Sequence, residues 1–144
     1  MKLLFRQCLA FPLFLCASMV AAGASADVVV VVSARSGVTS LSAGQITKIF
    51  LDKTDTLPNG EKAVPIDQAE GSQIRDEFYS KVLNKNSSRI SAYWAKVIFA
   101  GKGHPPKQME GNVSVRRAVA DNPNAIGYID RSTVDSSVRI VLDP

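Results

Sequence analysis

The residues best suited to chemistry lie in a short polar segment, residues 67–73, that follows an apolar stretch of the chain. Gly71 lets the backbone approach a ligand closely, and Ser72 supplies a hydroxyl. The amides of Ser72, Gln73 and Ile74 are among the four at a helix start that have no partner within the helix. Because such a helix start attracts negative charge, this segment is a candidate oxyanion-binding site.

The same segment admits a second interpretation. Ser is a common N-cap residue, so Ser72 can instead stabilise the helix by about 1 kcal/mol without touching a ligand. Four carboxylates lie in or beside the segment. They are either metal ligands or charges that stabilise the first helical turn, and the helix-stabilising role is the favoured interpretation. They are Asp67, Glu70, Asp76 and Glu77. Their charge disfavours a fully ionised oxyanion.

The sequence does not predict an enzyme, a metal site or a bound cofactor. His104 is the only histidine, and it lies in a Gly- and Pro-rich stretch that predicts a surface loop. A histidine-based metal cluster is therefore excluded, and a serine nucleophile would lack a base. The chain contains no G-x-S-x-G elbow, no P-loop and no G-x-G-x-x-G motif.

The elements that must position the polar segment alternate between strands and helices. Five consecutive valines, Val28 to Val32, predict a central strand covered on both faces. The predicted elements are, in order, a strand at 28–32, a helix from the capping box at 42–45, a strand at 63–66, helices from 72, from 87 and from 112 or 114, and strands at 125–129 and 138–142. Ile90, Trp94, Val97 and Ile98 form the apolar face of the helix from 87. This order predicts an α/β fold of three layers, with a mixed, mostly parallel sheet flanked by helices.

A second candidate segment is the loop from Ser33 to Leu41, after the valine strand. In open α/β sheets, small ligands bind beyond the carboxyl ends of the strands, where helices begin. This loop and residues 67–73 are two such places. The loop adds Ser36, Thr39 and Ser40 as lesser candidates for ligand binding.

Residues 1–26 have the three parts of a secretory signal peptide: a basic start, an apolar run and small residues that end in Ala24-Ser25-Ala26. The apolar run is shorter than the roughly 20 residues that cross a bilayer. Cleavage after Ala26 leaves one domain, residues 27–144, with 15 Lys+Arg against 13 Asp+Glu and without Cys8 and Cys16. Such an exported domain is expected in the bacterial periplasm. Nucleic-acid binding is disfavoured because no basic stripe with interleaved aromatic residues remains.

Four stretches, in their order and spacing, resemble the periplasmic phosphate-binding proteins that serve ABC importers. They are Leu41 to Leu51, Glu70-Gly71-Ser72, Trp94 followed by Gly101-Lys102-Gly103, and Ala125 to Ile129. In that family the segment equivalent to residues 70–74 reads acid-Gly-Ser-Gly-Thr, with an Arg four residues before the Ser. Gln68, Gln73 and Ile74 stand here in place of that Arg, Gly and Thr, so a charge-assisted pair of hydrogen bonds and one hydroxyl are missing.

The resemblance covers residues 27–144 and implies a single lobe of a periplasmic-binding-protein-like (type II) fold. It implies a non-enzymatic solute-binding protein that binds phosphate or a related oxyanion weakly, as a component of a phosphate ABC transport system, with an ABC permease or another envelope protein as partner. The implied ligand-binding residues are Gly71, Ser72, Gln73, Ile74, Ser36, Thr39 and Ser40. The alternative is a regulatory or adaptor module that uses the lobe to bind another envelope protein, which the missing Arg and the missing second lobe favour.

Overall fold

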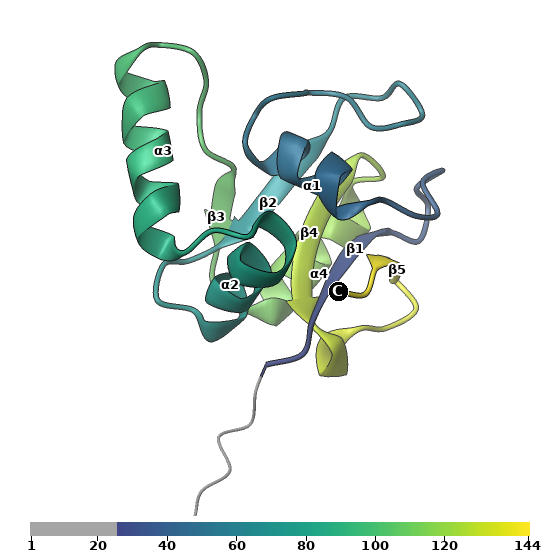
Figure 1. The fold of residues 1–144 in the computed structure, drawn as a ribbon. Coiled ribbons are helices and arrows are strands. Elements are labelled where there is room, and N and C mark those ends of the chain that lie inside the picture. Colours follow the sequence, from purple (N-terminus) through teal and green to yellow (C-terminus); the bar gives the residue numbers. More distant parts are fainter. Residues whose placement is uncertain (1–25) are drawn as a thin grey trace, which may run out of the picture.

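The computed structural model describes residues 26–144, so Cys8, Cys16 and nearly all of the predicted signal peptide lie outside the described residues. The described chain forms a five-stranded sheet flanked by helices (Figure 1). The strands are β1 (Val28–Ser33), β2 (Val64–Gln68), β3 (Lys107–Met109), β4 (Ala125–Asp130) and β5 (Val138–Leu142). The helices are α1 (Ala43–Phe50), α2 (Gln73–Phe78), α3 (Ser87–Phe99) and α4 (Asn112–Asp121), with a π-helical turn η1 (Tyr79–Leu83) and a 3-10 turn η2 (Arg131–Thr133). The predicted α/β class is confirmed.

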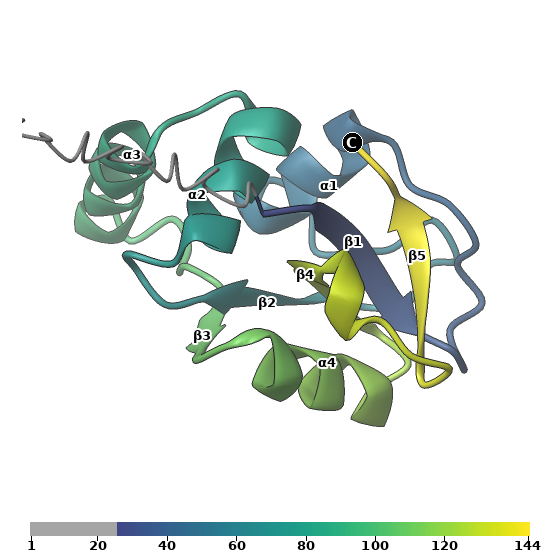
Figure 2. The ribbon, with the colours of Figure 1, turned by 90° about the horizontal axis from the view of Figure 1, so that it is seen from below.

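Helices cover both faces of the sheet, with α1 and α2 on one face and α4 on the other (Figure 2). The valines of β1 alternate between the two core clusters. Val28, Val30 and Val32 pack on the side of α1 and α2, and Val29 and Val31 pack on the side of α4. Each of the five is at most 1% exposed, as a strand buried on both faces requires.

The strand order is β3-β2-β4-β1-β5, and the sheet is mixed. β2 runs parallel to β3 and β4, whereas β1 runs antiparallel to β4 and β5. Parallel pairs are therefore half of the pairings, fewer than the sequence predicts. A strand buried on both faces carries the same apolar pattern in either direction, so its direction leaves no signal in the sequence. β3 is a short polar edge strand that hydrophobic patterning does not predict.

The helix starts follow the sequence more closely than the helix faces do. The capping box at α1 is present, with the amide of Gln45 donating to Ser42 Oγ at 3.1 Å and the amide of Ser42 donating to Gln45 Oε1 at 2.9 Å. In α3, Ile90 and Trp94 are buried as predicted, but Ile98 is 55% exposed. That assignment to the apolar face is wrong because α3 lies beyond the β3 edge of the sheet (Figures 1 and 2), and the sheet does not cover its last turn.

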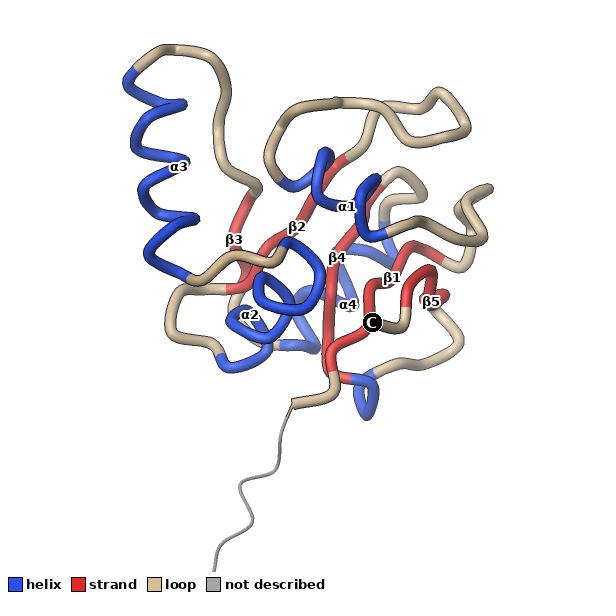
Figure 3. The backbone as a smooth tube through the Cα atoms, in the orientation of Figure 1, coloured by secondary structure: helices blue, strands red, loops and turns tan. Residues whose placement is uncertain are grey.

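The chain leaves α3 through a long loop before it re-enters the sheet at β3 (Figure 3). His104 lies in this loop with its side chain 90% exposed, so the predicted surface position is confirmed. Among residues 26–144, no helix is both long enough and apolar enough to cross a membrane.

Candidate functional site

A cavity of about 630 Å³ opens where two helices begin, at the carboxyl ends of the neighbouring parallel strands β2 and β3. The segment between β2 and α2 supplies one wall, and the turn between β3 and α4 supplies the other. The lining residues are Ala26, Gln68, Ala69, Glu70, Gly71, Ser72, Gln73, Ile74, Glu110, Gly111, Asn112 and Asp130. The structure thus brings the four main predicted residues, 71–74, together around one cavity.

Ser72 is the N-cap of α2, and its hydroxyl already has two partners. Ser72 Oγ accepts a hydrogen bond from the amide of Arg75 at 3.4 Å and donates to Gln68 Oε1 at 3.3 Å. The amide of Ser72 donates to the carbonyl of Ala69. The predicted N-cap position of Ser72 is therefore confirmed. Of the neighbouring amides, that of Ile74 has no hydrogen-bond partner within the described chain.

Gln68 is only 2% exposed and is held from several sides. Its side-chain amide donates to Asn112 Oδ1 at 2.9 Å and to the carbonyl of Tyr128 at 3.1 Å. Its Oε1 accepts the hydroxyl of Ser72. Gln68 thus joins the end of β2 to β4 and to the start of α4, and its side chain does not project into the cavity as a free donor.

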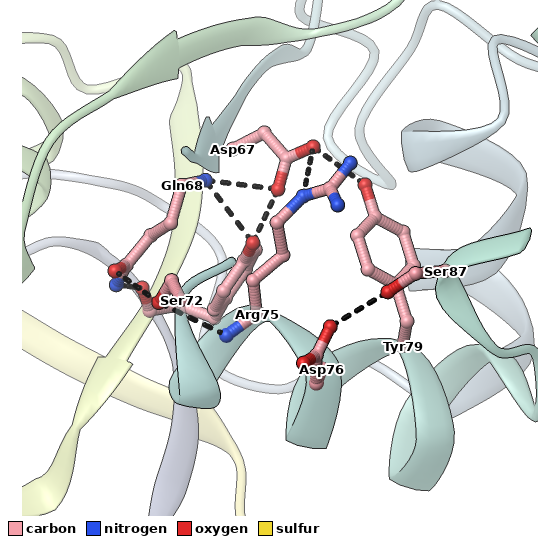
Figure 4. A network of polar contacts seen from close by, with 8 residues as sticks. Asp67, Gln68, Ser72, Arg75, Asp76, Tyr79 and Ser87 are labelled. Atoms are coloured by element: carbon pink, nitrogen blue, oxygen red, sulfur yellow. Dashed lines mark hydrogen bonds and ion pairs between the residues drawn. The ribbon is translucent and has the colours of Figure 1, made fainter. Parts of the chain in front are cut away.

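Beneath α2, the buried carboxylate of Asp67 is the centre of a polar cluster (Figure 4). Tyr79 Oη donates to Asp67 Oδ2 at 2.6 Å, and Tyr128 Oη donates to Asp67 Oδ1. The guanidinium Nε of Arg75 lies 3.5 Å from Asp67 Oδ2, with the guanidinium 4.8 Å from the ring centre of Tyr79. The amide of Gln68 also donates to Asp67 Oδ1, at 2.8 Å. We call Asp67, Arg75, Tyr79 and Tyr128 the Asp67 cluster.

The protonation states in the Asp67 cluster follow from its burial. Burial, reinforced by the negative charge of Asp67, raises the pKa of Tyr79 and of Tyr128 far above the ordinary tyrosine value. Both hydroxyls therefore remain donors at neutral pH. Burial acts to lower the pKa of Arg75, but the charge of Asp67 acts in the opposite direction and the net shift is upward, so Arg75 stays charged. The cluster stabilises the fold and places the start of α2.

The start of α4 contrasts with that of α2, because no side chain caps it. The amides of Asn112, Val113 and Ser114 have no hydrogen-bond partner within the described residues. Gly111 precedes the helix at φ +83°, a conformation that favours glycine, and its lack of a side chain leaves the helix end open to the cavity. The positive end of the α4 dipole therefore faces the cavity with unpaired donors.

The charged side chains that line the cavity are all acidic. Glu70, Glu110 and Asp130 line it, and no Lys or Arg is among the lining residues. Hydrogen bonds from the hydroxyl and then the amide of Ser132 lower the pKa of Asp130 below its usual value, so this carboxylate stays ionised. The cavity thus combines amide donors at its helix starts with carboxylate acceptors at its rim.

The sequence reasoning missed the wall that α4 supplies. Glu110, Gly111 and Asn112 directly precede the predicted helix, and Asp130 directly follows the predicted strand 125–129. The signal available was a Gly at the start of a helix that lacks a side-chain cap. It can be recognised as a site only once β3 is known to lie beside β2, because that pairing brings the start of α4 next to residues 67–73.

The structure does not bring the three lesser candidates to this cavity. β1 runs antiparallel to β4, and β4 runs parallel to β2. The loop after β1 therefore lies at the opposite ends of the strands from Ser72. Ser36 is buried, and its hydroxyl accepts the amide of Val38. Thr39 and Ser40 are exposed on the same loop. The sequence analysis expects ligand-binding residues in both the loop after β1 and the segment after β2. Because these two strands run in opposite directions, the two loops lie at opposite ends of the sheet.

The four carboxylates around α2 have separate roles. Asp67 is buried in its cluster, Asp76 accepts the hydroxyl of Ser87 at 2.7 Å, and Glu77 pairs with Lys81. Glu70 lines the cavity. Within residues 26–144, no group of three or more His, Cys, Asp or Glu side chains is placed to hold a metal ion.

No protein family model matches the chain, and no curated protein matches it in sequence. Solved structures do match. One is a candidate phosphate ABC transporter substrate-binding protein from Clostridium perfringens with bound phosphate, at TM-score 0.64 and 24% identity over 81% of this chain and 44% of that one. An ABC-type phosphate transport receptor from Vibrio cholerae matches at TM-score 0.63 and 18% identity, over 81% of this chain and 45% of that one.

PstS from Borrelia burgdorferi matches at TM-score 0.60 and 14% identity, over 81% of this chain and 46% of that one. The chain has a periplasmic-binding-protein-like fold. It spans less than half the length of each of these three structures and corresponds to a single lobe. The predicted fold and the resemblance to phosphate-binding transport proteins are thus confirmed at the level of structure, and the matched proteins are transport proteins rather than enzymes.

Proposed function

We propose that the protein is a non-enzymatic, solute-binding lobe of the bacterial envelope that takes a protonated oxyanion, first of all inorganic phosphate, in the cavity between the starts of α2 and α4. The observation that carries the proposal is the uncapped start of α4. Its first three amides have no partner in the described chain, and its first residue, Asn112, lines the cavity at the carboxyl ends of β2 and β3 together with Gly111. Parallel strands present ligands at this edge in open α/β sheets. Solute delivery to an ABC permease is the transport role that the fold suggests.

The acidic rim selects the protonation state of the ligand. Phosphate at neutral pH still carries O–H groups, which can donate to Glu70, Glu110 or Asp130, while its other oxygens accept from the helix amides. Sulfate carries no proton at neutral pH and would meet the same carboxylates by repulsion. We therefore expect phosphate to bind in preference to sulfate.

The affinity is expected to be low. The cavity is lined by no guanidinium or ammonium group, and charge-assisted hydrogen bonds to such groups are worth about 1.5–3 kcal/mol each. The hydroxyl of Ser72 and the amide of Gln68 are used within the protein. One lobe also leaves one side of the ligand in water, so we expect a dissociation constant near ~1 mM, or about 4 kcal/mol of binding free energy.

Thermal unfolding with phosphate and with sulfate tests the proposal. Phosphate at about ten times its dissociation constant would add about 1.4 kcal/mol to the free energy of unfolding, which raises Tm by about 6 °C. The double variant Glu70→Gln with Glu110→Gln should narrow the difference between phosphate and sulfate, because it removes two of the three carboxylates that accept phosphate protons and repel sulfate. Equal shifts with both anions in the unaltered protein, or no shift with either, would contradict the proposal.

A second function is favoured by one observation. Gln68 and Ser72, whose side chains could otherwise donate to an oxyanion, are bonded to each other. A lobe whose former ligand donors hold its own fold is suited to act as an adaptor for another envelope protein. An absence of any anion effect, together with recovery of one defined envelope protein by the immobilised lobe, would support the adaptor over the solute-binding function.

A further inference from the structure

Charge is strongly segregated along the chain. Residues 78–109 contain six Lys+Arg and no Asp or Glu, whereas the rest of the described chain contains nine Lys+Arg and thirteen Asp+Glu. We call residues 78–109 the basic segment. It includes η1, the whole of α3 and the loop to β3. α3 lies at the side of the molecule beyond the β3 edge of the sheet, away from β5 and α4 (Figures 1 and 2).

The exposed face of α3 is apolar at its end. Phe99 is 96% exposed and Ile98 is 55% exposed, although both are large hydrophobic side chains. At 100° per residue, Phe99 lies opposite Ile90, which is buried in the core, and on the same face as Ala92 and Ala95. Phe99 and Ile98, with the small side chains of Ala92 and Ala95, form an exposed apolar patch, and such a patch rimmed by polar residues is typical of an interaction site.

Basic side chains flank this apolar face. Arg89 and Lys96 are seven residues apart, hence on one side of α3, and both are exposed. Near the start of α3, Lys85 and Arg89 line a hollow of about 230 Å³ together with Ser80, Asn84 and Asn86. Glu70 and Asp76 lie on the other flank of α3, where they share a hollow with Ser87, Ser88 and Ser91. Asp52 lies beside the loop after α3, where its carboxylate accepts a hydrogen bond from the amide of His104. The exposed face thus has one apolar end and one cationic side.

The end of α3 is held rigidly, so Phe99 does not lie on a loose terminus. Gly101, at φ +64°, ends the helix, with its amide donating to the carbonyl of Ile98 at 3.0 Å and the amide of Lys102 donating to the carbonyl of Val97 at 3.1 Å. Tyr93 Oη donates to the carbonyl of Leu51 at 2.6 Å and ties the middle of the helix to the end of α1. The exposed face is therefore presented in a fixed geometry.

We infer that α3 docks the protein on the surface of an anionic lipid bilayer, with Phe99 and Ile98 in the interfacial region and Arg89 and Lys96 against lipid phosphates. An interfacial helix of this kind combines Lys and Arg on one side with Phe or Leu on the other. Each Lys or Arg near an anionic surface strengthens binding about fivefold, and no acid within the basic segment opposes this attraction. Lys85 and Arg89 in their hollow suit a lipid phosphate.

Two other occupants fit less well. A second copy of the chain would bring the cationic side of α3 into the interface twice, because a two-fold interface uses the same surface of both copies, and the basic segment offers no acid to pair with Arg89 or Lys96. A protein partner needs about 800 Å² of buried surface on each side, whereas a 13-residue helix offers a face of about 20 Å by about 10 Å. A bilayer surface needs no such complementary shape.

Sedimentation with lipid vesicles tests the inference on residues 26–144, which contain both core clusters. We expect binding to vesicles of equal parts phosphatidylcholine and phosphatidylglycerol, no binding to phosphatidylcholine alone, and release at about 1 M salt, where charges are screened within ~3 Å. Phe99→Ala should lower the partition coefficient about tenfold. The double reversal Arg89→Glu with Lys96→Glu should lower it by more than about tenfold.

Matched controls lie on α4, across the sheet from α3. Val113→Ala truncates another exposed apolar side chain, and Arg117→Glu reverses another exposed charge, and neither should change vesicle binding. Binding that survives both changes in α3, or that is equal on the two kinds of vesicle, would overturn the inference. If the protein ignores vesicles but binds polyglutamate in a manner that depends on Phe99, the occupant is an acidic polypeptide and the bilayer assignment is wrong.

Discussion

Two neighbouring parts of the molecule use their side chains in opposite ways. Around the start of α2, polar groups are paired with one another: Ser72 with Gln68, and Asp67 with both Tyr79 and Tyr128. Along α3, large apolar and basic side chains face the solvent without a partner of opposite charge in the same segment. The residues that look most like ligand donors thus hold the fold, and residues that look like core or solvated surface are available to a partner.

The difference follows from where the two helices lie relative to the sheet. α2 packs on the sheet, so the inner side of its first turn, with Ile74 and Arg75, is buried, and buried polar groups require partners inside the protein. α3 lies outside the sheet edge, where nothing but its inner face is covered. Whether side chains of a helix are available to a partner therefore depends on its neighbours in the fold as well as on its own residues.

The largest expected effect comes from breaking the Asp67 cluster. Asp67→Asn removes the charge that pairs with Arg75, which is only 3% exposed, and leaves a buried cation without a counterion. Loss of one partner of a buried ion pair costs about 3–5 kcal/mol. Chemical denaturation should show a loss of this size in the free energy of unfolding. Asp76→Asn changes an exposed carboxylate on α2, next to Arg75, and should cost less than about 0.5 kcal/mol. Equal losses in the two variants would mean that the cluster is not a buried unit.

Alkaline pH should break the same cluster without any mutation. The pKa of Tyr79 and of Tyr128 is raised in the folded protein, so the stability they provide is fully present below the unfolded-state pKa of about 10 and is lost as pH rises above it. Each tyrosine then removes about 1.4 kcal/mol per pH unit, or about 2.7 kcal/mol for the two together. Denaturation curves at rising pH measure the slope, and Tyr128→Phe should halve it. A slope unchanged in that variant would assign the alkaline loss to other groups.

A smaller effect is expected from Ser72→Ala. The N-cap hydrogen bond to the amide of Arg75 is lost, which costs about 1 kcal/mol of the free energy of unfolding. The rise of Tm with phosphate should remain, because the proposed ligand contacts are helix amides and the hydroxyl is bonded to Gln68. Ser80→Ala, in the exposed part of η1, is the matched control and should change neither quantity. If Ser72→Ala abolishes the phosphate effect while the protein stays folded, the hydroxyl does turn towards the ligand.

Much of the fold can be predicted from local patterns. The five valines of β1, the capping box of Ser42 and Gln45, and the N-cap position of Ser72 are each set by residues within one turn or one strand. The carboxyl-end position of residues 67–73 follows from the alternation of strand and helix. These features are local, so the sequence records them directly.

The site is less predictable because it depends on strand pairing. The cavity exists because β3 pairs with β2 and brings Glu110 and Asn112 opposite Ser72, and β3 has only three residues with no apolar signal. The position of Ser36 also depends on strand pairing. Because β1 pairs antiparallel with β4, the loop that contains Ser36 lies at the other ends of the strands from Ser72. Ile98 fits the helical period of α3, but burial also requires a neighbour, and the sheet ends before that turn.

The smallest expected effect belongs to α3, and it separates a docking surface from a piece of core. Phe99→Asp places a charge where a 96% exposed Phe stood, so the free energy of unfolding should change by less than about 0.5 kcal/mol. Trp94→Ala, five residues earlier on the buried face of the same helix, should cost about 3 kcal/mol or more. Denaturation curves of the two variants measure both values. A loss above about 1 kcal/mol for Phe99→Asp would show that this side chain packs against the protein in solution, and α3 would then have no apolar face to offer a bilayer.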